Sequence, residues 1–561
     1  MRIKIASVLL LATGLSAVSL LARQPEHAKH AMVVAQEPLA ADVGLRVLQS
    51  GGNAIDAAVA IGFALAVTYP FAGNIGGGGF LLARFADGRT TFVDFREKAP
   101  MTATRNMYLD SKGNLTKDSV VGWRAAGVPG TVRGLELAHK KYGHKPWTEL
   151  LNPAVQLASE GYLVSYSLDA SLHSEGETKL LSQFPESKRV FLDAAHYGDK
   201  FVQPELAATL KRIRDRGAND FYDGETAQKL TAAMAANGGL ITLTDLKAYQ
   251  AEESEPLRGR YRGYEIITAP PPSAGGVGLL QMLGMLEGSG YEKRGAGSGS
   301  SIHYVAEVMR RFYADRSEYL GDPDFYKVPI SKLLDPKYIT GRRDSIDPLH
   351  ATPSTQIRPG NLKIREGTET THFNIVDSEG NAVAVTYTLN DGYGSGVTVP
   401  GLGFLLNDEM DDFAAKPGTE NLFHLIQGES NAIQPSKRPV SSMTPTIVLR
   451  NGKLFLMLGA PGGSRIINGV LQVFLNVVDF NMNVQDAVDW PRFHHQWMPD
   501  VLYVEKGISP DTLRILRGMG HKVLPLEPIS PVVARVEAIL NDGGWLQGAT
   551  DPRGNGKAEG Y

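Results

Sequence analysis

Thr370 is the residue of this sequence with the clearest potential for chemistry. It begins a stretch rich in β-branched residues and directly follows a polar run over residues 363–369. A chain cut on the N-terminal side of Thr370 would carry a hydroxyl nucleophile and a free α-amine on one residue. A threonine activated by its own α-amine is an established catalytic device. On spacing alone an ordinary strand threonine is the simpler interpretation, so other residues have to support the assignment.

Paired glycines near residue 460 offer a second chemical feature. Gly462 and Gly463 lie between a predicted strand and a predicted helix. Adjacent backbone N–H groups at the positive end of a helix can stabilise negative charge, as an oxyanion hole requires. A close-packed turn is the alternative. A phosphate-binding loop is disfavoured because the Lys-Ser/Thr pair is missing, and the glycines at 76–79 run into a strand instead of a helix.

Charged and hydroxyl residues form two sets that together suit an α-amino acid. Four carboxylates lie between Asp408 and Asp412, where they could hold an ammonium group. Arg96 with Ser441 and Ser442 suits a carboxylate, because a guanidinium binds a carboxylate through two parallel hydrogen bonds. A solvated acidic turn, a surface arginine and turn serines are the ordinary alternatives. A calcium site lacks the EF-hand spacing.

Composition removes several function classes. The 561 residues include no cysteine, which excludes disulfides, thiolate-bound zinc and thiol catalysis. The 57 basic and 60 acidic side chains leave a formal net charge of −3, which argues against nucleic-acid binding. No Gly-x-Ser-x-Gly elbow is present to anchor an α/β-hydrolase triad. His494 and His495 would face opposite sides of a strand, so neither a metal nor another cofactor is expected.

The periodicity of apolar residues predicts the elements that must position these groups. Helices are expected over residues 39–68, divided by a turn at 50–53, and over most of 120–345. Strands are expected at 80–85, 91–95, 370–377, 382–390, 444–449 and 453–458, and a buried helix at 466–478. Because strand-rich segments flank a long helical region, we expect one α+β fold assembled from both halves of the chain.

Residues 1–22 have the features of a secretory signal peptide. Arg2 and Lys4 precede an apolar run over residues 5–21, and charge returns at Arg23. A transmembrane anchor is the alternative, but the run is short and interrupted for one. No other segment has 18 consecutive apolar residues. We therefore expect export to the periplasm or out of the cell, and no membrane span in the mature protein.

Seven stretches together make the sequence resemble the γ-glutamyltranspeptidases of bacterial type, also called γ-glutamyltransferase/glutathione hydrolases. They are spread over nearly all of the chain after the predicted signal peptide. The matching stretches are residues 51–58, 76–80, 94–97, 370–373, 407–413, 437–443 and 461–465.

The resemblance implies the fold of an N-terminal-nucleophile hydrolase, a four-layer αββα sandwich built from both halves of a self-cleaved precursor. The cut would fall between Glu369 and Thr370. It would yield a large subunit (23–369) and a small subunit (370–561) that stay associated as a heterodimer in one interwoven domain. Glu369 stands where some family members have glutamine, a difference that should not stop an N-to-O acyl shift.

The resemblance also implies a role for each candidate residue. Thr370 would be the nucleophile of self-cleavage and of turnover, with its α-amine as the base; such an amine has a pKa of about 7.7–8.0. Thr388 would orient the nucleophile, and Gly462 and Gly463 would stabilise the oxyanion. The residues implied to hold the substrate are Arg96, Ser441 and Ser442 for the α-carboxylate, and Asn390, Glu409 and Asp412 for the α-ammonium group.

The implied activity is cleavage of the γ-glutamyl amide of glutathione and related compounds through a γ-glutamyl ester of Thr370. The γ-glutamyl group would pass to water or to an amino-acid or dipeptide acceptor, without a cofactor. One departure from the family pattern is Phe423, which lies where bacterial relatives have a lid tyrosine. A phenylalanine lacks the hydroxyl that would bond Asn390, which bears on lid closure and on the balance between hydrolysis and transfer.

Two rivals come from the same superfamily: a cephalosporin (glutaryl) acylase and a poly-γ-glutamate depolymerase. Arg96 together with Asp412 favours an amino-acid head group, because a glutaryl group has no ammonium to pair with the acids. A rival of another class is a non-catalytic exported amino-acid-binding protein that has kept the pocket.

Overall fold

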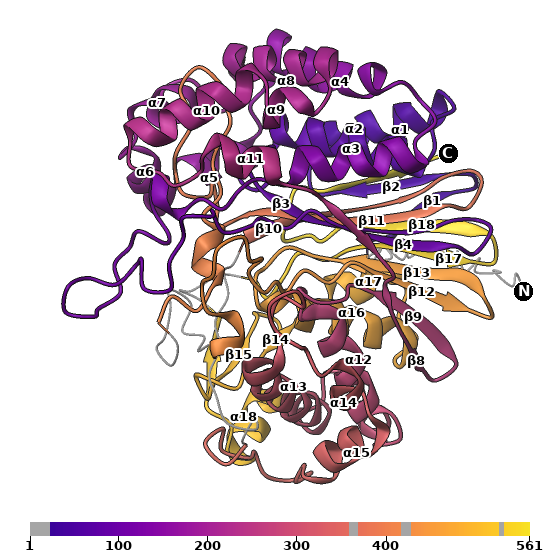
Figure 1. Ribbon diagram of the computed structural model, residues 1–561. Helices are drawn as coiled ribbons and strands as arrows, with labels where there is room; N and C mark the ends of the chain where they lie inside the picture. The colour runs from indigo at the N-terminus through magenta and orange to yellow at the C-terminus, as the bar shows by residue number, and fades with distance from the viewer. Residues whose placement is uncertain (1–22, 358–368, 417–427, 527–531) are drawn as a thin grey trace, which may run out of the picture.

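Two stacked β-sheets with helices on their outer faces form the molecule (Figure 1). The computed structural model describes residues 23–357, 369–416, 428–526 and 532–561. The predicted signal peptide and Phe423 lie outside the described residues. The layers follow in the order helix, sheet, sheet, helix, which confirms the predicted four-layer αββα sandwich.

Each sheet has seven strands, and every neighbouring pair is antiparallel. The first sheet runs in the order β19 (Lys557–Gly560), β2 (Met32–Ala35), β10 (Glu369–Val376), β11 (Ala382–Asn390), β3 (Gly78–Arg84), β4 (Thr90–Asp94) and β7 (Glu252–Ser254). The second sheet runs in the order β1 (Glu26–Ala28), β18 (Trp545–Ala549), β17 (Glu537–Asp542), β13 (Lys453–Gly459), β12 (Thr446–Arg450), β9 (Tyr264–Thr268) and β8 (Leu257–Tyr261).

Helices from the N-terminal half cover the first sheet. They are α1 (Pro38–Gln49), α2 (Ala54–Thr68), α3 (Thr131–Tyr142), α4 (Trp147–Glu160), α5 (Tyr166–Leu172), α6 (Glu175–Leu181), α7 (Pro185–Ser187), α8 (Pro204–Arg216), α9 (Asn219–Tyr222), α10 (Glu225–Ala236) and α11 (Leu243–Ala248). A short ribbon of β5 (Tyr162–Leu163) and β6 (Lys200–Phe201) joins this layer. The expected break between two helices is confirmed: Asn53 caps α2 in a capping box with Asp56.

Helices from later in the chain cover the second sheet. They are α12 (Gly275–Leu286), α13 (Gly299–Tyr319), α14 (Ile330–Leu333), α15 (Pro336–Asp344), α16 (Arg465–Val478), α17 (Val484–Asp489) and α18 (Pro510–Gly518), with a small sheet of β14 (Phe493–His494), β15 (Leu502–Val504) and β16 (Val523–Pro525). The described part of the chain contains no helix that combines the length and apolar character needed to cross a membrane.

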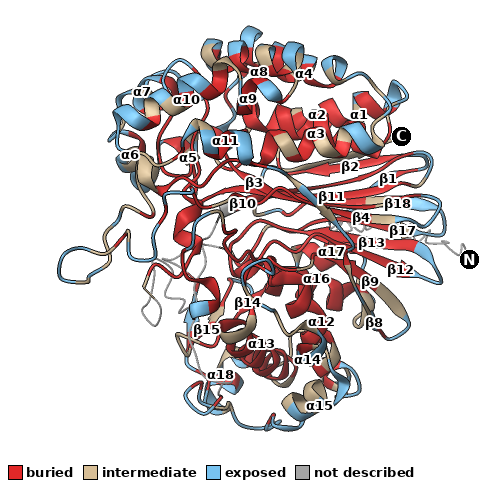
Figure 2. Ribbon diagram, in the orientation of Figure 1, coloured by how far each residue is buried: buried red, intermediate tan, exposed pale blue. Residues whose placement is uncertain are grey.

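The central strands β2, β3 and β11 are buried on both faces, which explains their nearly continuous apolar runs (Figure 2). Along β3, Phe80 and Leu82 belong to the core between the sheets, whereas Leu81 and Ala83 belong to the core under α1 and α2. This alternation follows from the two-residue period of a strand. The first sheet therefore contributes one face to each of two hydrophobic cores, whereas both faces of the second sheet belong to one of them.

Both sheets combine strands from before and after residue 370. The pair β10–β11 lies between β2 and β3, and the run β12–β13–β17–β18 lies between β9 and β1. This arrangement confirms that both halves of the chain build the fold. It also places β10, whose second residue is Thr370, beside β2 from the other half.

The prediction for residues 120–345 missed five described strands, because this region also contains the short β5 and β6 and the strands β7, β8 and β9. Strands β8 and β9 form a hairpin around Arg262 and Gly263, which both have positive φ angles of 47° and 86°. Such a turn is typical of two-residue hairpins, so the sequence carried a signal. The alternating charged residues of β8 hid its strand character. The strands near the termini, β1, β2 and β17–β19, were also not predicted, and the strand expected at 444–449 is found at Thr446–Arg450.

Candidate active site

Thr370 is buried at the start of β10, with 4% of its surface exposed. Its hydroxyl lies 3.4 Å from the hydroxyl oxygen of Thr388 on the neighbouring strand β11. The Thr388 hydroxyl in turn accepts a hydrogen bond of 2.8 Å from the backbone N–H of Asn390. The pairing of β10 and β11 shifts register beside Thr370, which gives it a position apart from the regular ladder. The two threonines predicted to act together are thus in contact.

The glycines at 76–79 let neighbouring backbone approach Thr388 closely. A Cβ atom at Gly77 would lie 2.0 Å from the Thr388 carbonyl oxygen, and one at Gly79 would lie 2.4 Å from the Thr386 carbonyl oxygen. Asn74 completes the contact, because its side-chain amide donates to the Thr388 carbonyl oxygen at 2.8 Å and its oxygen accepts from the Gly77 N–H. This Gly-rich segment leads into a strand, as expected, and supports the strand that carries Thr388.

The second pair of glycines lies where the sequence predicted it, between β13 and α16. Gly462 and Gly463 have φ angles of +135° and +55°, which residues other than glycine rarely adopt. The first turn of α16 begins directly behind them, with the Arg465 N–H donating to the Gly462 carbonyl oxygen. The loop therefore lies at the positive end of a 14-residue helix.

The side chain of His372 on β10 packs against β13 of the other sheet, close to the Gly462–Gly463 loop. Its ring lies so close to Gly459 of β13 that a Cβ there would come within 2.1 Å of it. The ring Nδ1 lies 2.8 Å from the Thr386 hydroxyl, and burial lowers the pKa of His372 to about 3. A neutral histidine two residues after Thr370 thus packs against the strand that leads to Gly462.

Arg96 is fully enclosed and ion-paired with acids of the short turn at Glu409–Asp412. Its guanidinium forms ion pairs with Glu409 and Asp412, and it also donates to the Pro439 and Val440 carbonyl oxygens at 3.4 and 3.3 Å. Three of the predicted site segments therefore meet at one side chain. The sequence assigned Arg96 and the acids to opposite ends of a ligand; in this structure they neutralise each other, as buried charges must.

Glu97 is a further member of this cluster, to which the sequence assigned no role. Its carboxylate lies 3.6 Å from the Arg96 guanidinium, and burial raises its pKa to about 7. Burial also raises the pKa of Glu409 well above its usual range. The only sequence signal for a role of Glu97 was its position directly after Arg96. The arrangement can hold a proton near neutral pH because three carboxylates surround one guanidinium.

Asn390 ends β11 with a φ angle of +83°, which is unusual for a residue other than glycine. Its side-chain amide donates to the Asp408 carbonyl oxygen at 3.1 Å and reaches the Asp408 carboxylate at 3.4 Å. Burial raises the pKa of Asp408 well above its usual range. Asn390 thus connects the strand of Thr388 to the acidic turn, and its strained backbone fits a functional position.

The two predicted serines lie on the segment that follows Val440. The Ser441 hydroxyl accepts from the Met443 N–H at 3.1 Å, and the Ser442 hydroxyl accepts from Arg316 of α13 at 3.3 Å. Arg316 is buried, and the sequence gave no reason to single it out. A second guanidinium beside the serines strengthens the positive end of the site.

His494 and His495 are buried beside residues of α16 and α13 and do not belong to this site. Asn468 and Gln496 flank the ring of His494, and Arg310 and Asp500 flank the ring of His495. Burial lowers the pKa values of the two rings to about 3 and about 4. Neither histidine joins a possible metal cluster among the described residues.

Comparison with known families decides what this site belongs to. A family model described as "Gamma-glutamyltranspeptidase" matches residues 40–561. A glutathione hydrolase proenzyme of Pseudomonas sp. (strain A14) is 48% identical over 568 residues, which cover 98% of both chains. The chain belongs to the γ-glutamyltranspeptidase family.

Solved structures agree with this γ-glutamyltranspeptidase assignment. A cephalosporin acylase from Bacillus halodurans is similar with a TM-score of 0.84 at 29% identity, covering 96% of this chain and 97% of that one. A γ-glutamyltranspeptidase chain from Helicobacter pylori is 47% identical, with a TM-score of 0.56, and covers 58% of this chain and 94% of its own length. The fold is thus shared by γ-glutamyltranspeptidases and an acylase, so the side chains of the site have to decide between substrates.

Proposed function

We propose that this chain is a precursor that cuts itself before Thr370 and then acts as a γ-glutamyltransferase and glutathione hydrolase. The observation that carries the proposal is the contact between the Thr370 and Thr388 hydroxyls. Asn390 bonds both Thr388 and Asp408, and Asp408 directly precedes the acids that pair with Arg96.

The self-cleavage step needs only groups of the chain and water. The Thr370 hydroxyl attacks the carbonyl carbon of Glu369 and passes its proton to the departing nitrogen. The C–N bond breaks, and residue 369 is left as an ester on Thr370. This step already frees the α-amine of Thr370; water then hydrolyses the ester, which frees the Thr370 hydroxyl and the carboxylate of residue 369.

In turnover the new α-amine takes the proton of the Thr370 hydroxyl while the oxygen attacks the γ-amide carbon of the substrate. An α-amine has a pKa of about 7.7–8.0, which suits a base near neutral pH. The N–H groups of Gly462 and Gly463 stabilise the oxyanion at the start of α16. The protonated amine then gives its proton to the leaving amine, and a γ-glutamyl ester remains for attack by water or by an acceptor amine.

The charged cluster binds the α-amino-acid head of the γ-glutamyl group. Arg96, Ser441 and Ser442 hold the α-carboxylate, and Asn390, Glu409 and Asp412 hold the α-ammonium group. A zwitterion that enters between Arg96 and its acids replaces one set of ion pairs by another, so each buried charge keeps a partner. Such exchange makes binding depend on both charges of the substrate.

Substitution of Thr370 tests the proposal. Thr370→Ala should give a single uncut chain with no activity on a γ-glutamyl chromogenic anilide, because both steps need the hydroxyl. Thr370→Ser, which keeps the hydroxyl, should still be cut. N-terminal sequencing of the wild-type small fragment should begin at Thr370. Normal cutting of the Thr370→Ala variant would overturn the assignment.

A glutaryl acylase activity is the second candidate, favoured by the similarity to the cephalosporin acylase. The three acids around Arg96 favour the amino-acid head group, because a glutaryl group has no ammonium for them to pair with. Equal kcat/KM values for a γ-glutamyl and a glutaryl anilide would contradict the γ-glutamyl specificity.

Location and assembly complete the proposal. Residues 1–22 direct export and are removed, and the two fragments remain together as a heterodimer. Supporting features are the charge pattern of the first 22 residues and the presence of strands from both fragments in each of the two sheets. Mass spectrometry of the purified large fragment would reveal its first residue; a fragment that begins at Met1 would contradict removal of the segment.

A further inference from the structure

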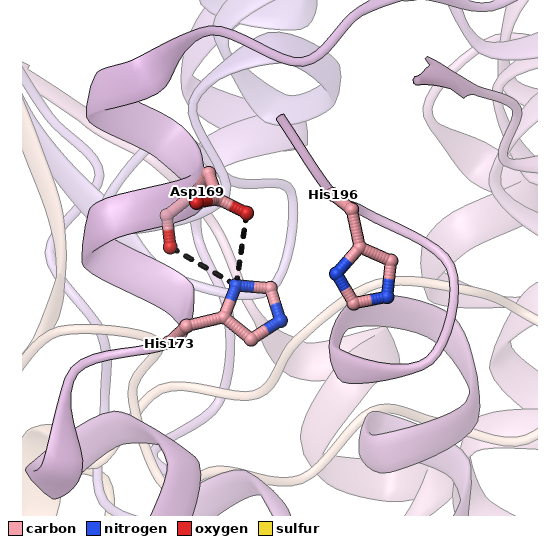
Figure 3. Close-up of side chains that lie close together, drawn as sticks. All are labelled: Asp169, His173 and His196. Atoms are coloured by element: carbon pink, nitrogen blue, oxygen red, sulfur yellow. Dashed lines mark hydrogen bonds and ion pairs between the residues drawn. The ribbon is translucent and has the colours of Figure 1, made fainter. Parts of the chain in front are cut away.

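A cluster of one carboxylate and two imidazoles lies on the surface, outside the site described above. Asp169 and His173 come from α5 and the residue that caps its C-terminus, and His196 comes from the loop before β6. One ligand atom from each residue lies within 4.8 Å of the others. Figure 3 shows the three side chains turned toward one another, with the Asp169 carboxylate beside Nδ1 of His173.

Helix geometry places the first two residues together. Positions four apart on a helix share one face, which brings Nδ1 of His173 to 3.2 Å from the Asp169 carboxylate. The rings of His173 and His196 stack with centroids 4.9 Å apart and planes 17° apart. Among the described residues no group hydrogen-bonds to the His196 ring, which is exposed and can turn toward the other two.

The supporting contacts already hold the cluster in place. The Tyr197 N–H donates to the Asp169 carboxylate at 3.0 Å, which ties the loop of His196 to α5. The same loop is fixed at its far end, because the Val164 N–H donates to the Asp199 carbonyl oxygen at 2.9 Å. A bound ion would therefore order little additional backbone.

Oxygen atoms lie beside both nitrogens of His173. Nδ1 is 3.1 Å from the Asp169 carbonyl oxygen and 3.2 Å from its carboxylate, and Nε2 is 3.4 Å from the Leu192 carbonyl oxygen. A neutral imidazole has one N–H, so its other nitrogen points a lone pair at an oxygen that also has lone pairs, and the two repel. A cation on Nδ1 removes this conflict and leaves the Nε2–H to donate to Leu192, the support that metal-bound histidines usually have.

A second cluster, of His303, Glu307 and His521, does not share these properties. It is buried, and the two rings bond each other at 2.8 Å. The Glu307 carboxylate is already paired with Arg310 and Arg311 at 3.0 and 2.7 Å. By contrast, among the described residues no lysine or arginine pairs with Asp169.

We propose that Asp169, His173 and His196 bind one divalent transition-metal ion, with Zn²⁺ as the reference ion. Two imidazoles and a carboxylate suit zinc and its first-row neighbours better than calcium or magnesium, which prefer oxygen ligands. Zinc–ligand bonds of about 2.0–2.2 Å require the three ligand atoms to close by roughly 1 Å, which the exposed His196 side chain allows. Solvent would complete the coordination.

Calorimetric titration of the tag-free protein with ZnCl₂ tests the site. The wild type should bind one equivalent that the double variant His173→Ala/His196→Ala binds at least about tenfold more weakly. His350→Ala is the matched control, because His350 is exposed and pairs with Asp347 at 3.2 Å but has no third ligand within the part of the chain that the structure describes. Its titration should equal that of the wild type.

Asp169→Asn provides a second variant that keeps the shape of the side chain and its acceptor for Tyr197. It should also weaken zinc binding by about tenfold or more, with circular dichroism and activity like those of the wild type. Should the double variant fail to fold, this variant decides the question. Zinc binding with equal stoichiometry and Kd in wild type and Asp169→Asn, or no zinc binding by the wild type, would overturn the proposal.

Discussion

At the scale of single residues, the site is organised around Arg96, a guanidinium with 1% of its surface exposed. Three carboxylates surround it, so its charge is neutralised before any substrate arrives. Buried ion pairs contribute little net stability but are costly to break, because the remaining partner stays buried without compensation. Arg96 therefore matters for folding as well as for binding.

Arg96→Lys should raise the KM for a γ-glutamyl anilide by about tenfold to a hundredfold, since a lysine cannot replace the two-pronged hydrogen bonds of a guanidinium. Self-cleavage should persist, because Thr370 is unchanged. Steady-state kinetics on protein whose N-termini have been sequenced separates the two effects. An unchanged KM would remove Arg96 from the binding site.

Glu97 should make stability depend on pH. Its pKa is raised by burial to about 7, so between its usual value and pH 7 the folded chain binds more protons than the unfolded chain. Stability should therefore fall as pH rises through this window, by on the order of 2–3 kcal/mol. Urea unfolding at pH 5 and pH 7 in the uncut Thr370→Ala background measures the loss. Glu97→Gln should flatten it, and an identical loss in that variant would assign the effect to other groups.

At the scale of elements, the strand β11 is fixed by glycines at the start of its neighbour β3 and just before it. The contact between Gly77 and the Thr388 carbonyl oxygen leaves no room for a side chain. The same holds between the sheets, where Gly459 accommodates the His372 ring. Backbone spacing thus determines where the Thr388 hydroxyl stands relative to Thr370.

Gly77→Ala should slow self-cleavage and destabilise the protein by about 1–3 kcal/mol, because the new methyl group displaces β11. The time course of precursor conversion on a denaturing gel and urea unfolding measure the two effects. Gly341→Ala in α15 is a suitable control, since a Cβ there meets no atom within 4 Å and alanine favours helix. Equal cleavage rates in the two variants would contradict the positioning role of Gly77.

At the scale of the whole molecule, mixed strand pairing makes the two sides of residue 370 interdependent. Strands β10 and β11 have β2 and β3 as their outer neighbours, and the run β12–β13–β17–β18 has β9 and β1. A peptide bond can therefore be lost before Thr370 without loss of any strand pair. The burial of β11 on both faces keeps the pieces together by the hydrophobic effect.

Residues 370–561 expressed alone should not fold, because β10, β11, β12 and β13 would expose apolar faces and unpaired edges. Co-expression with residues 23–369 should restore a single species on gel filtration. A stable, monomeric and folded 370–561 fragment would show that the two sides are separable domains.

Local features of the site could be predicted from sequence because they depend on nearby residues. The hairpins of β3–β4 and β10–β11, the break between α1 and α2, and the turn at Gly462 follow from periodicity and from glycine and asparagine at turns. The β8–β9 hairpin was missed because its strand pattern is weak. The roles of Glu97 and Arg316 were missed because burial depends on distant segments.

The sequence by itself determined the elements around Thr370 and the family to which the chain belongs, since both reside in short runs of residues. Only the tertiary structure decided that Arg96 pairs with Glu409 and Asp412, that Glu97 joins them, and that β10–β11 lie between β2 and β3 from the other side of residue 370. The physical reason is range: propensity acts between neighbours in the chain, whereas ion pairing and burial act between groups brought together by folding.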